Sequence, residues 1–165
     1  MRKLIIIEDD KRLGKILELE FSERGYNSLW ITNMADIPKE AYDYAVVDLR
    51  VGNDSGIEII DLLKKENPDI SIVILTGHGS IATTVEAMKR GARNYLIKPA
   101  SIERIEDALL GKSIEETESE NKTLSQVEHE YIEYVLLQNN NNISKAAKAL
   151  GLHRQSLQRK LKKLP

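Results

Sequence analysis

The sequence predicts an α/β domain built on a parallel sheet, followed by a small all-α unit. Two observations in residues 1–110 support the α/β domain: short apolar runs recur along the chain, and stretches with the apolar spacing of amphipathic helices separate them. A third observation is the change of composition beyond residue 110, where a polar, acidic stretch leads into a basic segment with helical periodicity.

Five apolar runs are expected to form the strands, and three of them are almost wholly apolar, as strands buried on both faces should be. The runs are Lys3–Ile7, Ser28–Ile31, Tyr44–Leu49, Ile70–Leu75 and Asn94–Ile97. Strands that alternate with helices imply parallel βαβ units. Five such units in this length predict a flavodoxin-like, doubly wound, five-stranded parallel sheet with helices on both faces.

Helical spacing of apolar residues marks three of the connections between these runs. Gly25 can end the first helix, Asn67-Pro68 closes the second, and Gly91 ends the third. The residues that mark the helices are Leu13, Ile16, Leu17 and Phe21, then Ile57, Ile60, Leu63 and Lys64, and finally Ile81, Val85 and Met88.

Composition and charge limit the function classes. Hydrophobic residues make up 41% and charged residues 30% of the 165 residues, as in a soluble globular protein. No apolar run approaches the ~20 residues of a membrane span, and acids follow the first run too closely for a signal peptide. The absence of cysteine excludes disulfides, thiol redox sensing and cysteine-ligated zinc. We therefore expect a cytoplasmic protein with no membrane partner.

Polar side chains stand at the ends of four predicted strands. The first strand ends in Glu8-Asp9-Asp10, the third in Asp48, the fourth in Thr76 and the fifth in Lys98-Pro99. In an open parallel sheet, ligands bind outside the carboxyl ends of the strands, so these groups should surround one crevice. Each residue alone has an ordinary explanation, since Asp10, for example, can simply cap the first helix. Four such strand ends together indicate a site.

The chemistry of that site follows from its charges. Close carboxylates repel each other, and a hard divalent cation with oxygen ligands relieves the repulsion. Mg²⁺ takes one or two carboxylates and keeps positions open for water and phosphate oxygens, so the site suits a phosphoryl group. Asp48 at the central strand is the expected nucleophile of an acyl phosphate, Lys98 would offset the charge, and Thr76 could donate its hydroxyl to a phosphoryl oxygen.

These motifs resemble those of response-regulator receiver domains over residues 1–110. The matching segments are Ile7-Glu8-Asp9-Asp10, Val46-Val47-Asp48-Leu49, Leu75-Thr76-Gly77 and Tyr95-Leu96-Ile97-Lys98-Pro99. The resemblance implies that Asp48 is the phosphoacceptor and that Mg²⁺ is held by Glu8, Asp9, Asp48 and the backbone carbonyl of Arg50. It also implies that Thr76 and Tyr95 form a switch pair, that Lys98 pairs with the phosphoryl group, and that the Lys98–Pro99 bond is cis.

Two other phosphate-handling patterns do not fit the chain. Haloacid-dehalogenase-like phosphatases need a second acid two residues after the nucleophile, where this chain has Arg50. P-loop NTPases need a Gly-rich loop after the first strand, where this chain is acidic. The triplet Gly111-Lys112-Ser113 lacks both the upstream glycine and a preceding strand. We therefore expect a regulator and not an enzyme.

The segment after residue 110 begins with a polar, acidic stretch, residues 111–122, that is interpreted as a linker. A capping box of Ser125 and Glu128 is expected to open a helix beyond it. The run Asn139–Asn142 predicts a turn after that helix. The apolar face of the helix is expected to comprise Val127, Tyr131, Tyr134 and Val135.

The last 23 residues, 143–165, carry seven Lys or Arg and no Asp or Glu, although the whole chain has a net charge of -2. Ile143, Ala146, Ala147 and Leu150 mark a short helix, Gly151 suits a tight turn, and Leu157, Leu161 and Leu164 mark the inner face of a second helix. This pattern predicts a helix-turn-helix that reads the DNA major groove, where Arg suits guanine and Gln suits adenine. We expect Lys160 and Lys163 to touch phosphate or to remain in water, and His153 to begin the helix or contact phosphate. The candidate DNA-binding residues are His153, Arg154, Gln155, Gln158, Arg159, Lys160, Lys162 and Lys163.

Residues Leu124–Leu164 resemble the Fis-type helix-turn-helix. The combination of receiver, short linker and Fis-type tail is similar to the RegA/PrrA/ActR group of response regulators, above all at Ser80-Ile81-Ala82-Thr83 and along residues 151–161. The resemblance implies a receiver at residues 1–110, a linker at 111–122 and a DNA-binding domain at 123–165. It also implies a partner histidine kinase and, for the group, redox-responsive transcription.

The predicted function is that of a two-component response regulator. A histidine kinase would phosphorylate Asp48, and the modification would control binding to double-stranded DNA and favour a homodimer. Two alternatives stay open: a phosphorelay or signalling module whose tail docks protein partners, and a chromosome-organising protein that binds DNA whatever its phosphorylation state. A steep salt dependence of DNA affinity would argue against the first. Footprints that ignore Asp48 chemistry would favour the second.

Overall fold

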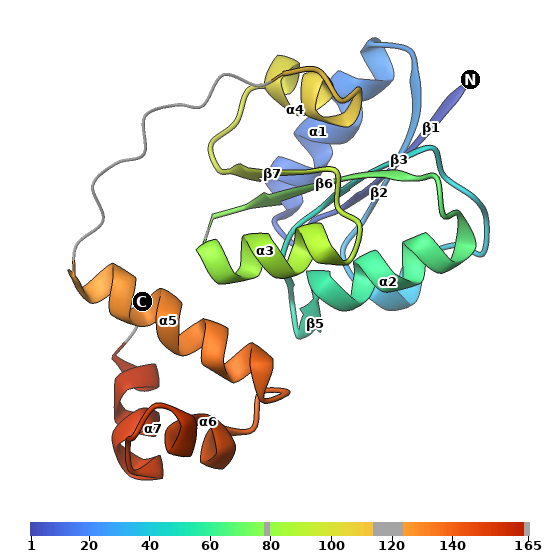
Figure 1. The fold of residues 1–165 in the computed structure, drawn as a ribbon. Coiled ribbons are helices and arrows are strands. Elements are labelled where there is room, and N and C mark those ends of the chain that lie inside the picture. Colours follow the sequence, from blue (N-terminus) through green and yellow to red (C-terminus); the bar gives the residue numbers. More distant parts are fainter. Residues whose placement is uncertain (78–79, 114–123, 164–165) are drawn as a thin grey trace. The chain divides into compact units, whose positions relative to one another are not determined.

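The computed structural model describes residues 1–77, 80–113 and 124–163, which form two compact units (Figure 1). The first unit holds a parallel sheet with its helices, and the second holds three helices. The predicted fold class, a doubly wound α/β domain followed by a small all-α domain, is confirmed. Most of the predicted linker and Leu164 of the predicted inner face lie outside the described residues.

The sheet has the strand order β2-β1-β3-β6-β7, and every neighbouring pair is parallel. Its strands are β1 (Arg2–Ile7), β2 (Tyr26–Ile31), β3 (Tyr44–Val47), β6 (Ser71–Thr76) and β7 (Asn94–Ile97). The sequence predicted that the third strand runs to Leu49, but β3 ends at Val47, so Asp48 is the first residue beyond it. All four ends that carry the polar side chains belong to adjacent strands.

Helices cover both faces of the sheet. In Figure 1, α1 (Lys11–Glu23) and α4 (Ile102–Leu109) lie on one face, and α2 (Gly56–Glu66) and α3 (Ile81–Lys89) on the other. No helix was predicted over residues 102–109. The 3-10 turn η1 (Met34–Asp36) and a small antiparallel hairpin, β4 (Arg50–Val51) with β5 (Asp54–Ser55), were not predicted either. Strands of two residues are too short to show the alternation by which strands are recognised.

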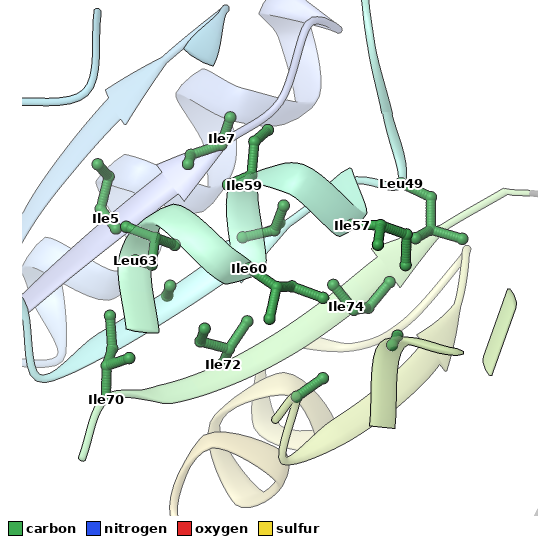
Figure 2. Close-up of a cluster of buried hydrophobic side chains, with 14 of the residues drawn as sticks. Ile5, Ile7, Leu49, Ile57, Ile59, Ile60, Leu63, Ile70, Ile72 and Ile74 are labelled. Carbon is green, nitrogen blue, oxygen red and sulfur yellow. The ribbon is translucent and has the colours of Figure 1, made fainter. Parts of the chain in front are cut away.

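Alternate residues of each strand supply two separate cores, because successive side chains of a strand point to opposite faces. Ile5 and Ile7 of β1 join the core beneath α2, whereas Leu4 and Ile6 join the core beneath α1 and α4. Figure 2 shows the first of these cores, with the isoleucines of α2 and β6 packed together. The two cores hold the sheet rigidly and thereby fix the positions of its strand ends.

The stripe that marked α3 in the sequence faces solvent. Ile81, Val85 and Met88 are all exposed, while Ala82 and Ala87 are buried. The helix itself was predicted, but periodicity alone did not reveal which side packs. Small alanines on the inner side let α3 lie close to the sheet and leave the larger side chains outside.

The second unit consists of α5 (Leu124–Gln138), α6 (Ile143–Ala149) and α7 (Arg154–Lys162). Asn140 and Asn141 adopt positive φ angles, a conformation that Asn tolerates better than most residues, and Asn142 then caps α6 by accepting from the Lys145 N–H. The predicted turn is therefore present. The core of the unit comprises Ile132, Val135, Ala146, Ala147 and Leu157, flanked by Leu136, Ile143, Leu150 and Leu161.

Two expectations about α5 were wrong. The helix already includes Leu124, so Ser125 lies in its first turn and not at a cap before it. Of the predicted apolar face only Val135 is buried, together with Ile132, whereas Val127, Tyr131 and Tyr134 are exposed. Apolar residues occupy more than one side of α5, and only the packing of α6 and α7 decides which side is covered.

A search of the described residues for a helix both long and apolar enough to span a bilayer found none.

Candidate functional site

Three carboxylates meet at the carboxyl edge of the sheet. Glu8 and Asp9 follow β1, and Asp48 follows β3, the neighbouring strand. One oxygen from each of the three lies within 4.8 Å of the others. We call these three residues the acidic cluster. The structure thus brings together side chains that are 40 residues apart in the chain, because parallel neighbouring strands end at the same edge.

Lys98, just beyond β7, reaches across to two members of the acidic cluster. Its Nζ donates to Glu8 Oε2 at 2.6 Å and to Asp48 Oδ2 at 2.8 Å. Glu8 is only 2% exposed and Asp48 8%, so both ion pairs are largely shielded from water. An ion pair in such surroundings is screened much less than one at the surface. The ammonium group therefore holds two buried carboxylates at the carboxyl edge of the sheet.

Lys98 offsets only part of the effect that burial has on the Glu8 carboxylate. Burial raises the pKa of the Glu8 carboxyl above its usual value, although the hydrogen bond from Lys98 acts in the opposite direction. Burial alone would lower the pKa of Lys98, but its hydrogen bonds to Asp48 and Glu8 raise it. Lys98 therefore stays charged at neutral pH, and the cluster still favours additional positive charge.

Backbone donors complete the surroundings of the cluster. The Arg50 N–H donates to Asp48 Oδ1 at 3.2 Å, and the Gly52 N–H, in the turn of the β4–β5 hairpin, donates to Asp9 Oδ2 at 3.1 Å. A Cβ atom at Gly56 would lie 2.4 Å from the Asp48 carbonyl oxygen, so only glycine allows α2 to begin so close to Asp48. The contact of Arg50 with the site is through its N–H, and metal ligation by its carbonyl stays a prediction.

Thr76 and Tyr95 lie on the two strands nearest to Lys98. Thr76 is the last residue of β6, is 1% exposed, and accepts the Lys98 N–H through its backbone carbonyl at 2.8 Å. Tyr95 on β7 is partly buried and packs against the core beneath α2. The Lys98–Pro99 peptide bond is cis, as the sequence resemblance implied.

The acidic cluster fits a divalent metal ion. Mg²⁺ prefers oxygen ligands at about 2.1 Å, so ligands on opposite sides of the ion lie about 4 Å apart. Three carboxylate oxygens within 4.8 Å of one another can meet that demand with small side-chain adjustments. Asp9 is exposed, which leaves one side of the cluster open to solvent and to an incoming group.

One residue in contact with the backbone of the acidic cluster was not predicted from the sequence. The indole Nε1 of Trp30, on β2, donates to the backbone carbonyl of Glu8 at 2.9 Å. The available signal was Gly14 inside the first predicted helix, because glycine within a helix is unfavourable and marks a close approach. A Cβ atom at Gly14 would lie 2.1 Å from that same indole nitrogen.

The candidate DNA-contact residues all belong to α7 and its flanks. Leu157 is fully buried and fixes the inner side of α7, while Arg154, Gln155, Arg159, Lys162 and Lys163 are exposed and Gln158 is half-buried. His153 occupies the N-cap position without a side-chain cap hydrogen bond and is exposed. Lys160 differs from the others, because its ammonium forms an ion pair with Glu128 of α5. The predicted phosphate contact of Lys160 would have to compete with that pair.

Family models match both units of the chain. The first, described as the response regulator receiver domain, covers residues 4–110, and the second, the bacterial regulatory protein, Fis family, covers residues 123–164. The chain belongs to the response regulator receiver family. It combines this receiver with a Fis-family helix-turn-helix, the arrangement of a two-component DNA-binding regulator.

Relatives that match this chain over nearly its whole length support this assignment. The photosynthetic apparatus regulatory protein RegA of Cereibacter sphaeroides is 35% identical over 98% of this chain and 91% of its own length. The acid tolerance regulatory protein ActR of Sinorhizobium medicae is 34% identical over 98% of this chain and 87% of its own length. The predicted resemblance to the RegA and ActR group is confirmed.

Solved structures show the same fold. A response regulator from Burkholderia pseudomallei, with a phosphorylated aspartic acid, a calcium ion and citrate, is 36% identical and has a TM-score of 0.63 over 98% of this chain and 99% of its own. The beryllofluoride-activated NtrC4 receiver domain dimer is 29% identical, with a TM-score of 0.61 over 68% of this chain and 100% of its own.

Proposed function

We propose that a histidine kinase phosphorylates Asp48 of this response regulator, and that the acyl phosphate controls DNA binding by α7 and thereby transcription. The observation that carries the proposal is the acidic cluster, which places Asp48 beside Glu8, Asp9 and the ammonium of Lys98. In the similar Burkholderia pseudomallei structure, an aspartic acid is phosphorylated. Because such a protein acts on DNA, we propose that it works in the cytoplasm, as a regulator and not as an enzyme.

The transfer would need few chemical groups. An Asp48 carboxylate oxygen attacks phosphorus, the bond from phosphorus to the donor imidazole breaks, and its electron pair returns to the imidazole nitrogen. The Lys98 ammonium already lies 2.8 Å from Asp48 Oδ2. It would stabilise the negative charge that the transfer brings to the phosphoryl oxygens. Bound by Glu8, Asp9, Asp48 and the Arg50 carbonyl, Mg²⁺ would neutralise negative charge on the carboxylates and the phosphoryl oxygens.

The signal would leave the site through Thr76 and Tyr95. Once Asp48 carries a phosphoryl group, the Thr76 hydroxyl would donate to it, and Tyr95 on the adjacent strand would follow the change in packing. The Lys98 N–H donates to the Thr76 carbonyl, so the two proposed partners of the phosphoryl group lie at the adjacent ends of neighbouring strands. The result is a population shift between two receiver states.

The proposal places the output in residues 123–165, with 111–122 as the connection to a receiver of residues 1–110. Exposed Arg and Gln side chains on α7 would read base edges, and exposed lysines would contact phosphates. A homodimer favoured by phosphorylation would present two such helices to an inverted repeat. Two observations support self-association: the activated NtrC4 receiver is a dimer, and Val127, Tyr131 and Tyr134 form an exposed apolar stripe on α5.

The first experiment tests the phosphoacceptor. In Mg²⁺ with a small phosphodonor, intact-mass measurement should show one phosphoryl group on the wild type and none on Asp48→Asn. Asp54→Asn is a matched control, because Asp54 is a nearby carboxylate that instead accepts the Met34 N–H. Equal labelling of wild type and Asp48→Asn would contradict the assignment of Asp48.

The second experiment tests the metal. Titration calorimetry should show markedly weaker Mg²⁺ binding by Asp9→Asn and a smaller loss for Glu8→Gln, because Glu8 is buried and already paired with Lys98. An unchanged Mg²⁺ affinity in Asp9→Asn would show that the acidic cluster is not the metal site.

The third experiment tests whether phosphorylation of the receiver controls DNA binding. Genome-wide footprinting with wild type and Asp48→Asn should show occupied sites that depend on phosphorylation. Footprints that are identical in both proteins would favour the constitutive DNA-organising alternative. Absence of salt-dependent DNA binding would favour the alternative of a protein-docking module.

A further inference from the structure

We propose that Trp30 is a positioning residue for the metal site, and that it fixes the Glu8–Asp9 peptide so that the Asp9 carboxylate faces Asp48. This inference rests on the proposed function, in which the acidic cluster binds Mg²⁺. Trp30 is the single tryptophan of the chain, and it lies on β2, an edge strand that neighbours β1.

Three hydrogen bonds, apart from the Lys98 ion pair, fix the backbone and the side chain of Glu8 in place. Its N–H donates to the Ile31 carbonyl at 3.1 Å, and its carbonyl accepts from the Trp30 indole at 2.9 Å. Its carboxylate accepts the Asp10 N–H at 3.0 Å. The Glu8 residue therefore cannot rotate without losing a partner, and the direction in which the chain leaves it, toward Asp9, is determined.

The Trp30 contact lies one residue beyond the end of the strand. The β1–β2 ladder pairs Ile7 with Ile31, and β1 ends there, so the Glu8 carbonyl has left the regular ladder. The indole supplies a donor at this position from a side chain. The neighbouring Asp9 is exposed, and its side chain accepts the Gly52 N–H, so the peptide that precedes Asp9 contributes strongly to its orientation.

The position of the indole is itself enforced by α1. Gly14 lies directly against it, since a Cβ atom there would be 2.1 Å from Nε1 and 2.3 Å from Cε2. The Trp30 backbone is held from the same helix, because its N–H donates to the Glu18 carboxylate at 3.0 Å. Gly14 and Glu18 are one helical turn apart, so the same face of α1 contacts both the indole and the backbone of Trp30. An indole buttressed in this way acts as a rigid support for a metal ligand.

Supporting contacts of this kind influence metal affinity, because they orient a ligand without touching the ion, and their loss typically weakens binding 10- to 100-fold. Trp30→Phe keeps an aromatic ring but removes the donor. Gly14→Ala keeps Trp30 but displaces the indole. We expect both variants to bind Mg²⁺ about 10-fold more weakly than the wild type.

The experiment measures Mg²⁺ affinity of the full-length protein by titration calorimetry, beside phosphorylation by a small phosphodonor over a range of Mg²⁺ concentrations. In both variants the half-saturating Mg²⁺ concentration should rise about 10-fold, while the rate at saturating Mg²⁺ stays close to that of the wild type. Ser28→Ala is the control: it removes another β2-to-α1 hydrogen bond, to the Glu18 carbonyl, and should leave Mg²⁺ affinity unchanged.

The outcomes separate the possible failures. If folded Trp30→Phe and Gly14→Ala melt at lower temperature but bind Mg²⁺ like the wild type, Trp30 has only a structural role and the inference is overturned. If Ser28→Ala loses as much Mg²⁺ affinity as they do, the effect belongs to β2 in general and the inference is also overturned. If Asp9→Asn binds Mg²⁺ as tightly as the wild type, the metal site proposed above is what fails.

Discussion

The two units of this protein carry their functional charges in opposite ways. In the receiver, the charges of Glu8, Asp48 and Lys98 are largely buried and held by one another. In the helix-turn-helix, those of Arg154 and Arg159 are exposed. A buried charge needs a partner at every moment, whereas an exposed charge is stabilised by water until a ligand displaces it. The receiver site should therefore be sensitive to the loss of one side chain, and the proposed DNA-contact surface should be sensitive mainly to salt.

The hydrophobic cores of the two units also differ, in size and number. The receiver has two cores, one on each face of a five-stranded sheet, while the second unit depends on a small cluster around Leu157. A small domain buries a smaller fraction of its surface and is correspondingly less stable. We therefore expect the receiver to tolerate single core substitutions better than the helix-turn-helix does.

The largest effect is expected for Lys98→Met, which leaves Glu8 and Asp48 buried without their common cation. Breaking a buried pair in this way costs up to about 3–5 kcal/mol. Thermal melts should show a lower midpoint that added Mg²⁺ restores by more than it raises the wild type. Lys3→Met is the matched control, because it breaks the half-exposed pair with Glu40 and should cost less than about 1 kcal/mol.

The same variant should change the pH dependence of stability. The pKa of Glu8 is raised in the folded state, so its contribution to stability is greatest below its ordinary value of 4.5 and is lost as pH rises through the raised pKa. Without Lys98 that pKa should rise further. The deficit of Lys98→Met should therefore shrink as pH falls, and a deficit independent of pH would mean that the carboxylates have found other partners.

The next largest effect is expected for a core substitution that tests whether the two units unfold independently. Leu157→Ala should cost about 2–5 kcal/mol, because it opens a cavity in a small core. Calorimetry should show that this variant loses the transition of the helix-turn-helix and DNA binding, yet keeps phosphorylation of Asp48. Ile59→Ala, in the receiver, should move only the other transition. A single transition that both substitutions shift would mean that the units unfold together.

A smaller effect is expected for Arg154→Ala on a selected DNA site. Loss of a base-reading Arg should cost about 1–3 kcal/mol and relax the preference at one base position. Binding titrations on specific and random DNA should show the loss only on the specific site. Equal losses on both would indicate a nonspecific contact with phosphates.

The smallest effect separates two lysines that look alike in the sequence. Lys163 is exposed, so Lys163→Ala should weaken binding to all sequences and lower the salt slope by about 1. Lys160 is paired with Glu128, so Lys160→Ala should change the slope less. Binding measured at two salt concentrations gives both slopes. Equal slopes for the two variants would mean that the Glu128 pair opens on DNA.

Sequence alone determined the order and type of most elements of this protein. Alternating apolar runs and amphipathic stretches predict parallel βαβ units. The polar residues that follow the runs then meet at one edge, because each crossover helix returns the chain to the start of the next parallel strand. The acids after β1 and β3 and the leucines of α7 could be recognised in this way. Short elements such as the β4–β5 hairpin could not, because two residues carry no period.

Only the tertiary structure decided which of several equivalent groups meet. Apolar residues cover more than one side of α5, and packing selected Ile132 and Val135 over Tyr131 and Tyr134. Lys98 had many acids available and pairs with Glu8 and Asp48, and Lys160 pairs with Glu128. The indole of Trp30 reaches the Glu8 carbonyl because Gly14, on another element, leaves it room. Such contacts depend on distances between elements, and those distances are set by close packing of whole cores and not by any local pattern.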